Sequence, residues 1–509
     1  MLAKVLSGAL IGIDAYPVEV EVDIARGLPQ FSTVGLPEGA VKESKDRVKS
    51  AIKNSGYEFP ARRITINLAP ADIRKDGAAF DLPMAVGLLT ATGAFKPERE
   101  GRYLLMGELS LDGRVKPVKG VLPVAAAARQ WDVAGFILPE ENAPEAAIVD
   151  SLPVFGVRDL GEVIAFLGGE NHPAPCRVDT REIFARTSLQ QDDFAEVRGQ
   201  EHVKRALEVA AAGSHNLLMS GPPGSGKTML ARRLPTILPA LSFHEALETT
   251  KIHSIVGLLP QSEALVASRP FRSPHHTISD AGLIGGGSVP RPGEVSLAHH
   301  GVLFLDELPE FKKNVLEMLR QPLEDGQVSI SRAAMSLTYP ASFMMVAAMN
   351  PCPCGYLGDP KHDCTCTPLM IQRYRTRLSG PLLDRIDLHV EVPRVPHRDL
   401  ADPKDGETSA AVRARVEAAR AIQRERLGCF GVHANARMQT RHIRKFCILD
   451  AEGERLLETV TDRLGLSART YTRILKLART IADLAGEERI RQPHLAEAIQ
   501  YRGLERGTS

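Results

Sequence analysis

A glycine-rich loop between an apolar stretch and a helical pattern carries the first chemical signal of this sequence. Residues 215–220 are typical of a short strand, and residues 229–234 begin an apolar helix. The loop fits the spacing G-x-x-x-x-G-K-[ST] and reads Gly221-Pro222-Pro223-Gly224-Ser225-Gly226-Lys227-Thr228. Its glycines let backbone N–H groups turn toward a phosphate, and the helix N-terminus adds further donors. We expect Lys227 to reach the β- and γ-phosphates of ATP and Thr228 to place its hydroxyl on Mg²⁺.

Polar residues that end two other apolar runs complete this chemistry. Residues 301–305 lead into Asp306 and Glu307, and residues 343–349 lead into Asn350. The carboxyl ends of parallel strands form the crevice in which ligands bind. We expect Asp306 to hold Mg²⁺ through water, Glu307 to polarise the attacking water as general base, and Asn350 to orient that water. The alternatives are an acid pair that only caps the next helix and an asparagine that only makes a turn.

Four of the seven cysteines crowd into one short segment. They form two C-x-C pairs, Cys352 with Cys354 and Cys364 with Cys366. Four thiolates this close suit a tetrahedral Zn²⁺ site, although pairs separated by two to four residues are more usual. Four reduced thiols or two redox-active disulfides are the alternatives. A metal held by four protein ligands would be structural, and it would fix the loop that follows Asn350.

The elements that must position these residues fall into four segments. Alternating strand and helix patterns over residues 193–395 predict a parallel sheet with crossover helices. Residues 1–168 read as a mixed α/β domain, and residues 169–192 as a linker that begins with a Gly/Pro-rich stretch. Residues 396–509 are almost entirely helical in pattern. The expected fold is therefore α/β, with an N-terminal domain, a central phosphate-binding core and a C-terminal helical lid.

The composition excludes several classes of protein. The 509 residues carry 63 Lys and Arg against 62 Asp and Glu, which excludes a globally basic, histone-like binder. Apolar residues make up 43% and charged residues 25% of the chain, which excludes bulk disorder. No apolar run is long enough to cross a membrane. The odd, clustered cysteines do not form a secreted disulfide framework, so we expect a reducing compartment, the cytoplasm.

Several longer segments resemble one family of ring-forming ATPases. The strand ends described above, together with residues 382–387, are similar to those of AAA+ ATPases. The more specific segments are 271–277 (FRSPHHT), 285–287 (GGG), 290–299 (PRPGEVSLAH) and 350–355 (NPCPCG). With the N-terminal domain, they resemble the magnesium-chelatase-like AAA+ ATPases of the ComM/YifB competence family over nearly the whole chain. This resemblance implies a bacterial homo-hexameric motor that promotes branch migration of DNA recombination intermediates during natural transformation, with a recombinase as a further partner.

The same resemblance implies roles for residues outside the three strand ends. Arg385 matches the arginine finger that reaches the γ-phosphate of a neighbouring subunit; an internal pair with a nearby Asp is the alternative. Arg469 matches the second sensor arginine of the lid, but Arg473 lies one helical turn later and is not separated from it by sequence. Gly199 and Gln200 match the segment that contacts adenine.

Two further segments resemble the pore hairpins of this clade. They are residues 285–295 and 328–337, which make Arg291 and Arg332 candidate contacts to DNA phosphates. Solvated surface arginines are the alternative. Residues 411–445 hold an excess of Lys and Arg that suits a phosphate backbone, a subunit interface or a solvated helix face equally well.

The N-terminal domain resembles the proteolytic domain of Lon. The similar segments are residues 75–83 and 107–115. Lon uses a serine activated by a lysine, but the matching positions here are Ala79 and Leu122. We therefore expect no peptidase activity. The favoured function is an ATP-driven DNA motor. A metal-chelatase motor subunit and a protein-remodelling ATPase are the alternatives, weakened by the Lon-like domain and by the absent Ser/Lys pair.

Overall fold

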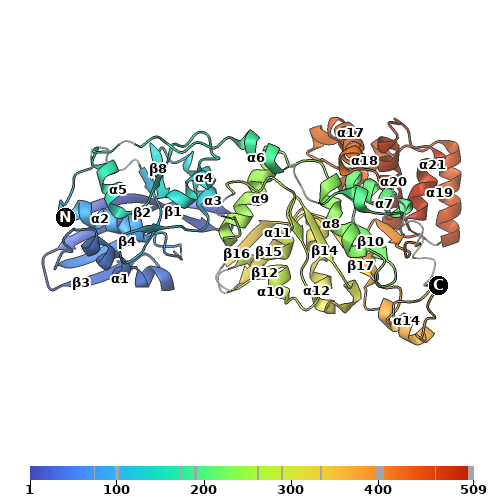
Figure 1. Ribbon diagram of the computed structural model, residues 1–509, viewed down its shortest axis with the longest axis horizontal. Coiled ribbons are helices and arrows are strands. Elements are labelled where there is room, and N and C mark those ends of the chain that lie inside the picture. Colours follow the sequence, from blue (N-terminus) through green and yellow to red (C-terminus); the bar gives the residue numbers. More distant parts are fainter. Residues whose placement is uncertain are drawn as a thin grey trace. The chain divides into compact units, whose positions relative to one another are not determined.

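The computed structural model describes the chain except for residues 74, 98–102, 172, 188–191, 261–262, 288–289, 333–334, 397–405, 465 and 503–509. Its described residues form two compact units (Figure 1). The N-terminal unit comprises Met1–Arg186 and Phe243–Ala267, and the C-terminal unit comprises Thr187–Ser242 and Ser268–Ser509. Each unit has its own hydrophobic core.

The N-terminal unit is built on a seven-stranded mixed sheet of order β3-β4-β2-β1-β5-β8-β9. Its strands are β1 Leu2–Ile11, β2 Asp14–Ala25, β3 Gln30–Val34, β4 Arg63–Ala69, β5 Tyr103–Leu105, β8 Gly135–Pro139 and β9 Val154–Val157, beside a small ribbon of β6 Glu108–Leu109 and β7 Val115–Lys116. Its helices are α1 Gly39–Asn54, α2 Asp81–Thr92, α3 Val121–Ala128, α4 Ala143–Ala146, α5 Leu160–Leu167 and α9 Phe243–Val256, and α6 Thr180–Thr187 lies at its boundary with the C-terminal unit. The pairs β1–β2 and β2–β4 are antiparallel, whereas β5, β8 and β9 run parallel.

The alternation of buried and exposed side chains explains why residues Asp14–Ala25 form the long strand β2. Val18, Val20 and Val22 are fully buried, while Glu19 between them is exposed. This is the pattern of a strand with one face on the core. The apolar helix α2 covers that face, and Gly87 allows its close approach, because a Cβ there would lie 2.7 Å from Val22 Cγ2.

The C-terminal unit contains a five-stranded parallel sheet of order β11-β14-β17-β10-β18. Its strands are β10 Leu217–Ser220, β11 Phe271–Arg272, β14 Val302–Leu305, β17 Met344–Met349 and β18 Leu388–Glu391. The central strands β10, β14 and β17 are buried along their whole length, as expected for a parallel sheet covered on both faces. The surrounding helices are α7 Glu201–Gly213, α8 Lys227–Ile237, α10 Asp280–Leu283, α11 Glu294–Leu297, α12 Lys313–Met318, α13 Arg320–Asp325, α14 Pro368–Arg375 and α15 Gly380–Leu383.

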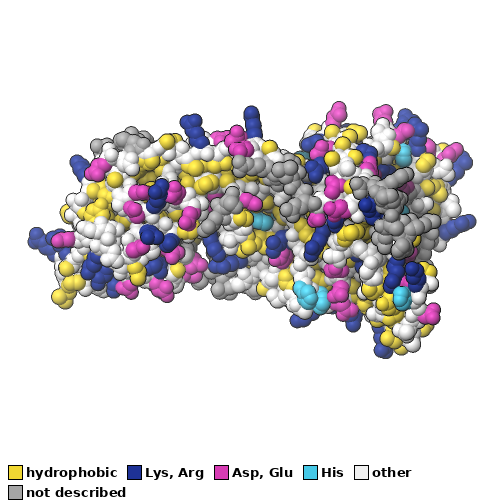
Figure 2. Space-filling model, viewed as in Figure 1, with side chains coloured by type: hydrophobic (Ala, Val, Ile, Leu, Met, Phe, Trp, Pro, Cys, Tyr) yellow, Lys and Arg dark blue, Asp and Glu magenta, His cyan; other side chains and the backbone are white. Residues whose placement is uncertain are grey.

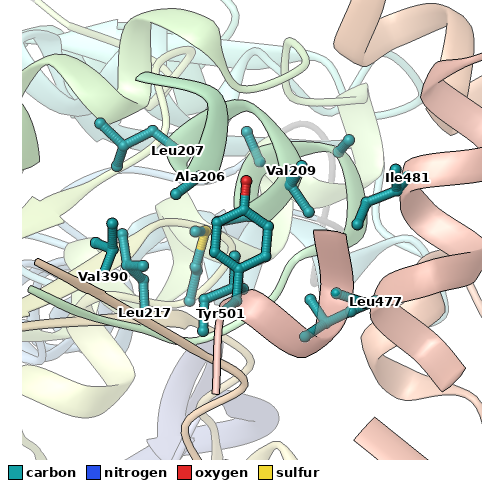
Figure 3. Close-up of a cluster of buried hydrophobic side chains, with 14 of the residues drawn as sticks. Ala206, Leu207, Val209, Leu217, Val390, Leu477, Ile481 and Tyr501 are labelled. Carbon is teal, nitrogen blue, oxygen red and sulfur yellow. The ribbon is translucent and has the colours of Figure 1, made fainter. Parts of the chain in front are cut away.

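Residues after the sheet form a helical region that packs on α7. Its helices are α17 Ser409–Leu427, α18 Thr440–Phe446, α19 Ala451–Leu464, α20 Ala468–Leu484 and α21 Gln492–Gln500. Leu477 and Ile481 of α20 meet Val209 of α7, and Tyr501 lies among them (Figure 3). The helical region and the sheet therefore share one core.

Two antiparallel hairpins project from the C-terminal unit. One pairs β12 Gly285–Gly286 with β13 Arg291–Pro292, and the other pairs β15 Gln327–Arg332 with β16 Met335–Pro340. Gly285 has a φ of +112°, and a Cβ there would lie 2.4 Å from the Arg291 carbonyl oxygen, so the first hairpin requires glycine. The hydroxyl of buried Tyr339 donates to the Pro290 carbonyl at 2.7 Å, which joins the two hairpins.

The expected α/β class, with a parallel sheet and a helical C-terminal region, is confirmed. No helix among the described residues combines the length and apolar character needed to cross a bilayer. Acidic and basic side chains alternate over the face shown in Figure 2, in keeping with the balanced charge. Sequence reasoning missed that α9 packs on α3. There, the Ser254 hydroxyl donates to Glu145 at 2.5 Å and the Lys119 ammonium donates to the Val256 carbonyl at 3.1 Å.

Candidate functional site

The phosphate loop joins the end of β10 to the start of α8. Gly224 and Gly226 have φ values of +74° and +91°, which turn the loop ahead of the helix N-terminus. Lys227 Nζ donates to the carbonyls of Gly221 at 2.7 Å and Pro222 at 2.9 Å. Burial lowers the pKa of Lys227, while the charge of Asp306 opposes that shift. The ammonium group therefore lies folded back on its own loop, within reach of a phosphate in the loop's concave side.

The predicted magnesium residues meet directly. The Thr228 hydroxyl donates to Asp306 Oδ2 at 2.7 Å. Asp306 follows β14, and its other oxygen accepts the Glu307 N–H at 3.0 Å. A hydroxyl beside a carboxylate is an oxygen donor set that suits Mg²⁺. The two residues therefore fit the ion that sequence analysis assigned to them.

Asn350 reaches the same place from the neighbouring strand. Because β17 lies between β14 and β10 in the sheet, its carboxyl end stands beside both. Asn350 Oδ1 accepts from Lys227 Nζ at 3.3 Å. The structure thus brings together Lys227, Thr228, Asp306 and Asn350 as the spacing predicted.

Glu307 has a partner that sequence reasoning did not identify. Its backbone is left-handed, with a φ of +53°, and its side chain is 56% exposed. His276 Nδ1 lies 3.1 Å from Glu307 Oε2. His276 belongs to the 271–277 segment, which sequence analysis noted only as part of a family resemblance.

Gln200 lies against the phosphate loop. Its side-chain amide donates to the carbonyls of Ser225 at 2.9 Å and Pro393 at 2.7 Å. Its buried Oε1 has no hydrogen-bond partner among the described residues. Gly199 and Gln200 both have positive φ, 60° and 58°, which makes the sharp entry into α7. An unused acceptor beside the loop suits the exocyclic amine of adenine.

Arg385 is held inside the single chain. Its guanidinium donates to the Pro381 carbonyl at 2.6 Å and pairs with Glu324, while its buried Nε makes no hydrogen bond with the part of the chain that the structure describes. Burial lowers the pKa of Arg385, and the charge of Glu324 opposes this shift. Three neighbouring cations lower the pKa further: Arg320, Arg469 and Arg473. The internal partner is Glu324, not the adjacent aspartates considered from sequence. An ion pair of this kind must open before Arg385 can reach a phosphate outside its own chain.

Arg469 and Arg473 differ in their surroundings. Arg473 pairs with the buried Asp387 at 2.5 Å. Burial raises the pKa of Asp387, but the charges of Arg473 and of other nearby cations outweigh that effect and hold the pKa far below its usual range. Arg469 is exposed, and no ion pair is found for it within the described residues. Arg469 is therefore the one whose guanidinium is available to a ligand.

The four clustered cysteines converge on one point. Their Sγ atoms lie within 4.8 Å of one another, with three separations of 3.4, 3.7 and 3.6 Å. An ion about 2.3 Å from each of four tetrahedral sulfurs would place them about 3.8 Å apart. A disulfide would need about 2.05 Å, and all four cysteines are free. The loop also contacts the phosphate loop, since a Cβ on Gly355 would lie 2.6 Å from Pro223 Cδ.

The predicted DNA-contacting arginines lie on the two hairpins. Arg291 is exposed on β13. Arg332 ends β15, and its side chain lies outside the described residues. In the basic 411–445 segment, six arginines make internal contacts with backbone oxygens or side chains; they are Arg413, Arg415, Arg420, Arg426, Arg437 and Arg441. The exposed basic surface there is smaller than the sequence indicated.

Of the two positions that resemble the Lon dyad, Leu122 is buried and Ala79 is partly exposed. Leu122 is fully buried, and its N–H donates to Glu145 Oε1 at 3.1 Å. Asp81, two residues after Ala79, is buried and paired with Arg47 at 2.6 Å. Neither dyad position carries a nucleophile or a base.

Comparison with known proteins gives the relationship. Three family models match the chain: magnesium chelatase subunit ChlI over residues 193–400, subunit ChlI of Mg-chelatase over 20–142, and the ChlI C-terminal model over 406–502. Competence protein ComM of Haemophilus influenzae is 47% identical over 99% of this chain and 98% of its own length. The chain belongs to the magnesium-chelatase-like ComM/YifB family. An uncharacterized YifB of Escherichia coli is 46% identical over 99% of this chain and 98% of its own.

Membership in the ComM/YifB family agrees with both units. A Lon protease of Mycolicibacterium smegmatis is 28% identical over 31% of this chain and 21% of its own length. The expected combination of a Lon-like domain with a magnesium-chelatase-like AAA+ unit is therefore supported by sequence relatives as well as by the two cores. Family membership and the residues gathered at the ends of β10, β14 and β17 together indicate an AAA+ ATPase.

Proposed function

We propose that the C-terminal unit binds ATP with Mg²⁺ and hydrolyses it. The observation that carries this proposal is the Thr228–Asp306 contact of 2.7 Å beside Lys227, at the mouth of a glycine loop. Lys227 and the loop N–H groups would hold the phosphates, and Thr228 and Asp306 would hold Mg²⁺, which neutralises phosphate charge. Glu307 would take a proton from the attacking water, which Asn350 orients. Gln200 and Gly199 would face the adenine.

We propose that a neighbouring copy of the chain completes the nucleotide site with an arginine. Arg385 would act as a finger toward the nucleotide of an adjacent copy, with Arg469 as the second sensor. The internal Arg385–Glu324 pair supports a residue that is held in reserve until a neighbouring phosphate replaces Glu324. We therefore propose a homo-hexamer in which hydrolysis depends on the neighbour.

The four cysteines would hold one structural Zn²⁺. The sulfur separations of 3.4–3.7 Å support a single shared ion over disulfides or a larger cluster. Because all four positions of a tetrahedron are filled by protein, this ion would fix the loop and take no part in the reaction.

We propose that the motor uses ATP hydrolysis to move along DNA. This movement would promote branch migration of recombination intermediates during transformation. The full-length similarity to a competence protein and the paired hairpins, with exposed Arg291, support this choice. A metal-chelatase motor subunit is the second candidate, since the family models carry that description. Because the net charge is low, we propose that the hairpins, and not the surface as a whole, contact DNA.

ATP turnover with different additions tests the proposal. We expect forked DNA to stimulate hydrolysis, and protoporphyrin or unfolded protein to have no effect. Lys227→Ala should lower turnover about 100-fold or more, with Arg232→Ala, on the same helix, as matched control. Unwinding of a branched strand-exchange intermediate should follow the same pattern. Turnover that DNA leaves unchanged, or that Lys227→Ala leaves intact, would overturn the DNA or the ATP assignment respectively.

A further inference from the structure

The short segment that leads into β18 carries Arg385 and ends in Asp387. β18 runs parallel to β10, with Leu388 beside Leu217, so the amino ends of these two strands lie together. The phosphate loop follows the carboxyl end of β10. The backbone of Arg385 is therefore attached to the end of the sheet that lies away from the phosphate loop of its own chain.

Asn216, the residue before β10, ties this segment to the sheet. Its side-chain amide donates to the Arg385 carbonyl at 3.0 Å, and its Oδ1 accepts the N–H of Met345 in β17 at 2.9 Å. Its backbone carbonyl accepts the N–H groups of Asp387 at 2.9 Å and Leu388 at 3.0 Å. These bonds hold the backbone around Arg385 and leave its guanidinium unused.

The Asp387 carboxylate joins the same segment to the helical region. Its Oδ2 accepts the backbone N–H of Asn216 at 3.0 Å, and its Oδ1 pairs with Arg473 of α20 at 2.5 Å. His215 lies between the two elements, with Nδ1 3.5 Å from Oδ2 of Asp387 and Nε2 2.8 Å from Oγ1 of Thr480 in α20. Because the Asp387 side chain is only 7% exposed, these contacts leave the carboxylate little freedom to move.

Arg385 lies among like charges from α20. Burial lowers the pKa of Arg385, and the charges of Arg469 and Arg473 lower it further. The Asp387 carboxylate pairs with Arg473 and so offsets one of these two charges. Without that carboxylate, Arg473 would repel the guanidinium of Arg385, and the segment would lose its ion pair with α20. Asp387 therefore holds the segment in place and reduces the repulsion that acts on its arginine.

We propose that Asp387 is a positioning residue for Arg385, and that Arg473 acts on hydrolysis through Asp387 and not by contact with ATP. The inference rests on the proposed function, because Arg385 is its finger toward the nucleotide of an adjacent copy. It adds a specific consequence. Asp387 and Arg473 of one chain set the rate at which the neighbouring chain hydrolyses ATP.

Rings assembled from two inactive variants test this consequence. An Arg385→Ala chain keeps its own nucleotide site but supplies no finger, and a Glu307→Gln chain supplies a finger but does not hydrolyse ATP. Each variant alone should be about 100-fold or more below the wild type in kcat. Co-expressed and purified through two different tags, they should recover turnover wherever an Arg385→Ala site faces an intact finger.

Asp387→Asn is then placed in one partner at a time. In the Glu307→Gln partner, it should lower the recovered kcat about tenfold or more, with KM for ATP within about twofold, because a misplaced finger costs rate and not ground-state binding. In the Arg385→Ala partner, it should change kcat less than about twofold, since that chain has no finger left to position. This asymmetry separates positioning from a loss of folding, which would affect either partner.

The same assay decides how Arg473 acts. In the Glu307→Gln partner, Arg473→Met should lower kcat as Asp387→Asn does, whereas Arg473→Lys, which keeps the charge, should retain most of the rate. Asp387→Asn combined with Arg473→Met should lose no more than either change alone. Arg491→Met, which breaks an exposed pair with Glu487 at 2.7 Å in the same helical region, is the matched control and should leave the recovered kcat unchanged.

Equal losses in both partners, or an undiminished kcat, would overturn the role of Asp387 while the recovered turnover keeps the proposed finger in place. Additive losses in the double variant, or equal losses in Arg473→Lys and Arg473→Met, would overturn the role of Arg473. A variant that native mass spectrometry does not find in the mixed ring also counts against the proposal. If Arg385→Ala and Glu307→Gln share a ring but recover no turnover, the proposed finger itself fails, and the role of Asp387 fails with it.

Discussion

The two units of the chain differ in how completely the polar groups at their compared sites are satisfied. In the N-terminal unit, residues at and near the positions that resemble the Lon dyad are buried and satisfied: Asp81 is fully buried and paired with Arg47, and Leu122 is fully buried at the position that resembles the lysine. In the C-terminal unit, Glu307 and Thr228 are exposed, and Gln200 keeps a buried oxygen that no described residue hydrogen-bonds.

This difference separates a framework from a reactive site. A fold keeps its core when its reactive groups are replaced, because the apolar packing does not depend on them. A reactive site instead leaves polar groups incompletely satisfied, since a ligand must complete them. The N-terminal unit therefore reads as structural, and the C-terminal unit as the chemical part of the molecule.

The sharpest test of this comparison replaces the general base. Glu307→Gln should lower kcat about 100-fold or more, because the amide accepts no proton. ATP binding and the melting temperature should stay the same, since Glu307 is exposed and fills no core position. Rapid-quench ATPase assays and fluorescent nucleotide titration measure both. A variant that keeps its turnover would remove the catalytic contrast between the units.

The matching test in the N-terminal unit replaces Arg47. Arg47→Met leaves the Asp81 carboxylate buried without its cation, which costs about 3–5 kcal/mol of stability. ATP turnover should change less than about twofold, because the reactive groups lie in the other unit. The only tryptophan, Trp131, belongs to the N-terminal unit, so its fluorescence reports unfolding of that unit. Arg158→Met, which breaks an exposed pair with Glu140, is the control and should have little effect.

Loss of the cysteine cluster should weaken nucleotide binding by a smaller factor than the one by which Glu307→Gln lowers kcat. Cys352→Ser with Cys364→Ser should reduce bound zinc from one ion per chain to none. Because Gly355 packs on Pro223 of the phosphate loop, we expect KM for ATP to rise about tenfold. The exposed Cys429→Ser is the control. Unchanged zinc content by atomic emission would reject the metal, and unchanged KM would reject its link to the loop.

A fall in pH should change the stabilities of the two units in opposite directions, and this is the smallest of the effects predicted here. Burial lowers the pKa of His389 to about 3, so protons bind preferentially to the unfolded chain as the pH falls from about 6.5 toward 3, and the C-terminal unit loses stability there. Burial raises the pKa of Asp81 and Glu145, so the folded N-terminal unit binds protons more readily than its unfolded chain and gains stability as the pH falls.

Calorimetry between pH 7 and pH 4, with Trp131 fluorescence to identify the N-terminal transition, measures this divergence. His389→Gln should reduce the acid sensitivity of the C-terminal transition, because an amide in place of the buried imidazole binds no proton in either the folded or the unfolded chain. Parallel shifts of both transitions would contradict the assigned origin of the pH dependence.

The sequence by itself determined the polar ends of the strands. The spacing of Lys227, Asp306 and Asn350 after apolar runs placed them on one sheet edge, because parallel strands end at the same side. The two C-x-C pairs also specified their cluster, since a short loop brings them back together. These are local patterns, set by the periodicity of strands and the reach of short loops.

Only the tertiary structure decided contacts between segments that are distant in the chain. It placed His276 at Glu307, gave Arg385 an internal partner in Glu324, and packed α9 on α3. It also gave six arginines of the basic segment partners within the chain. Side-chain partners of this kind depend on which surfaces pack together, and charge alone does not specify a partner when many residues of opposite sign are present.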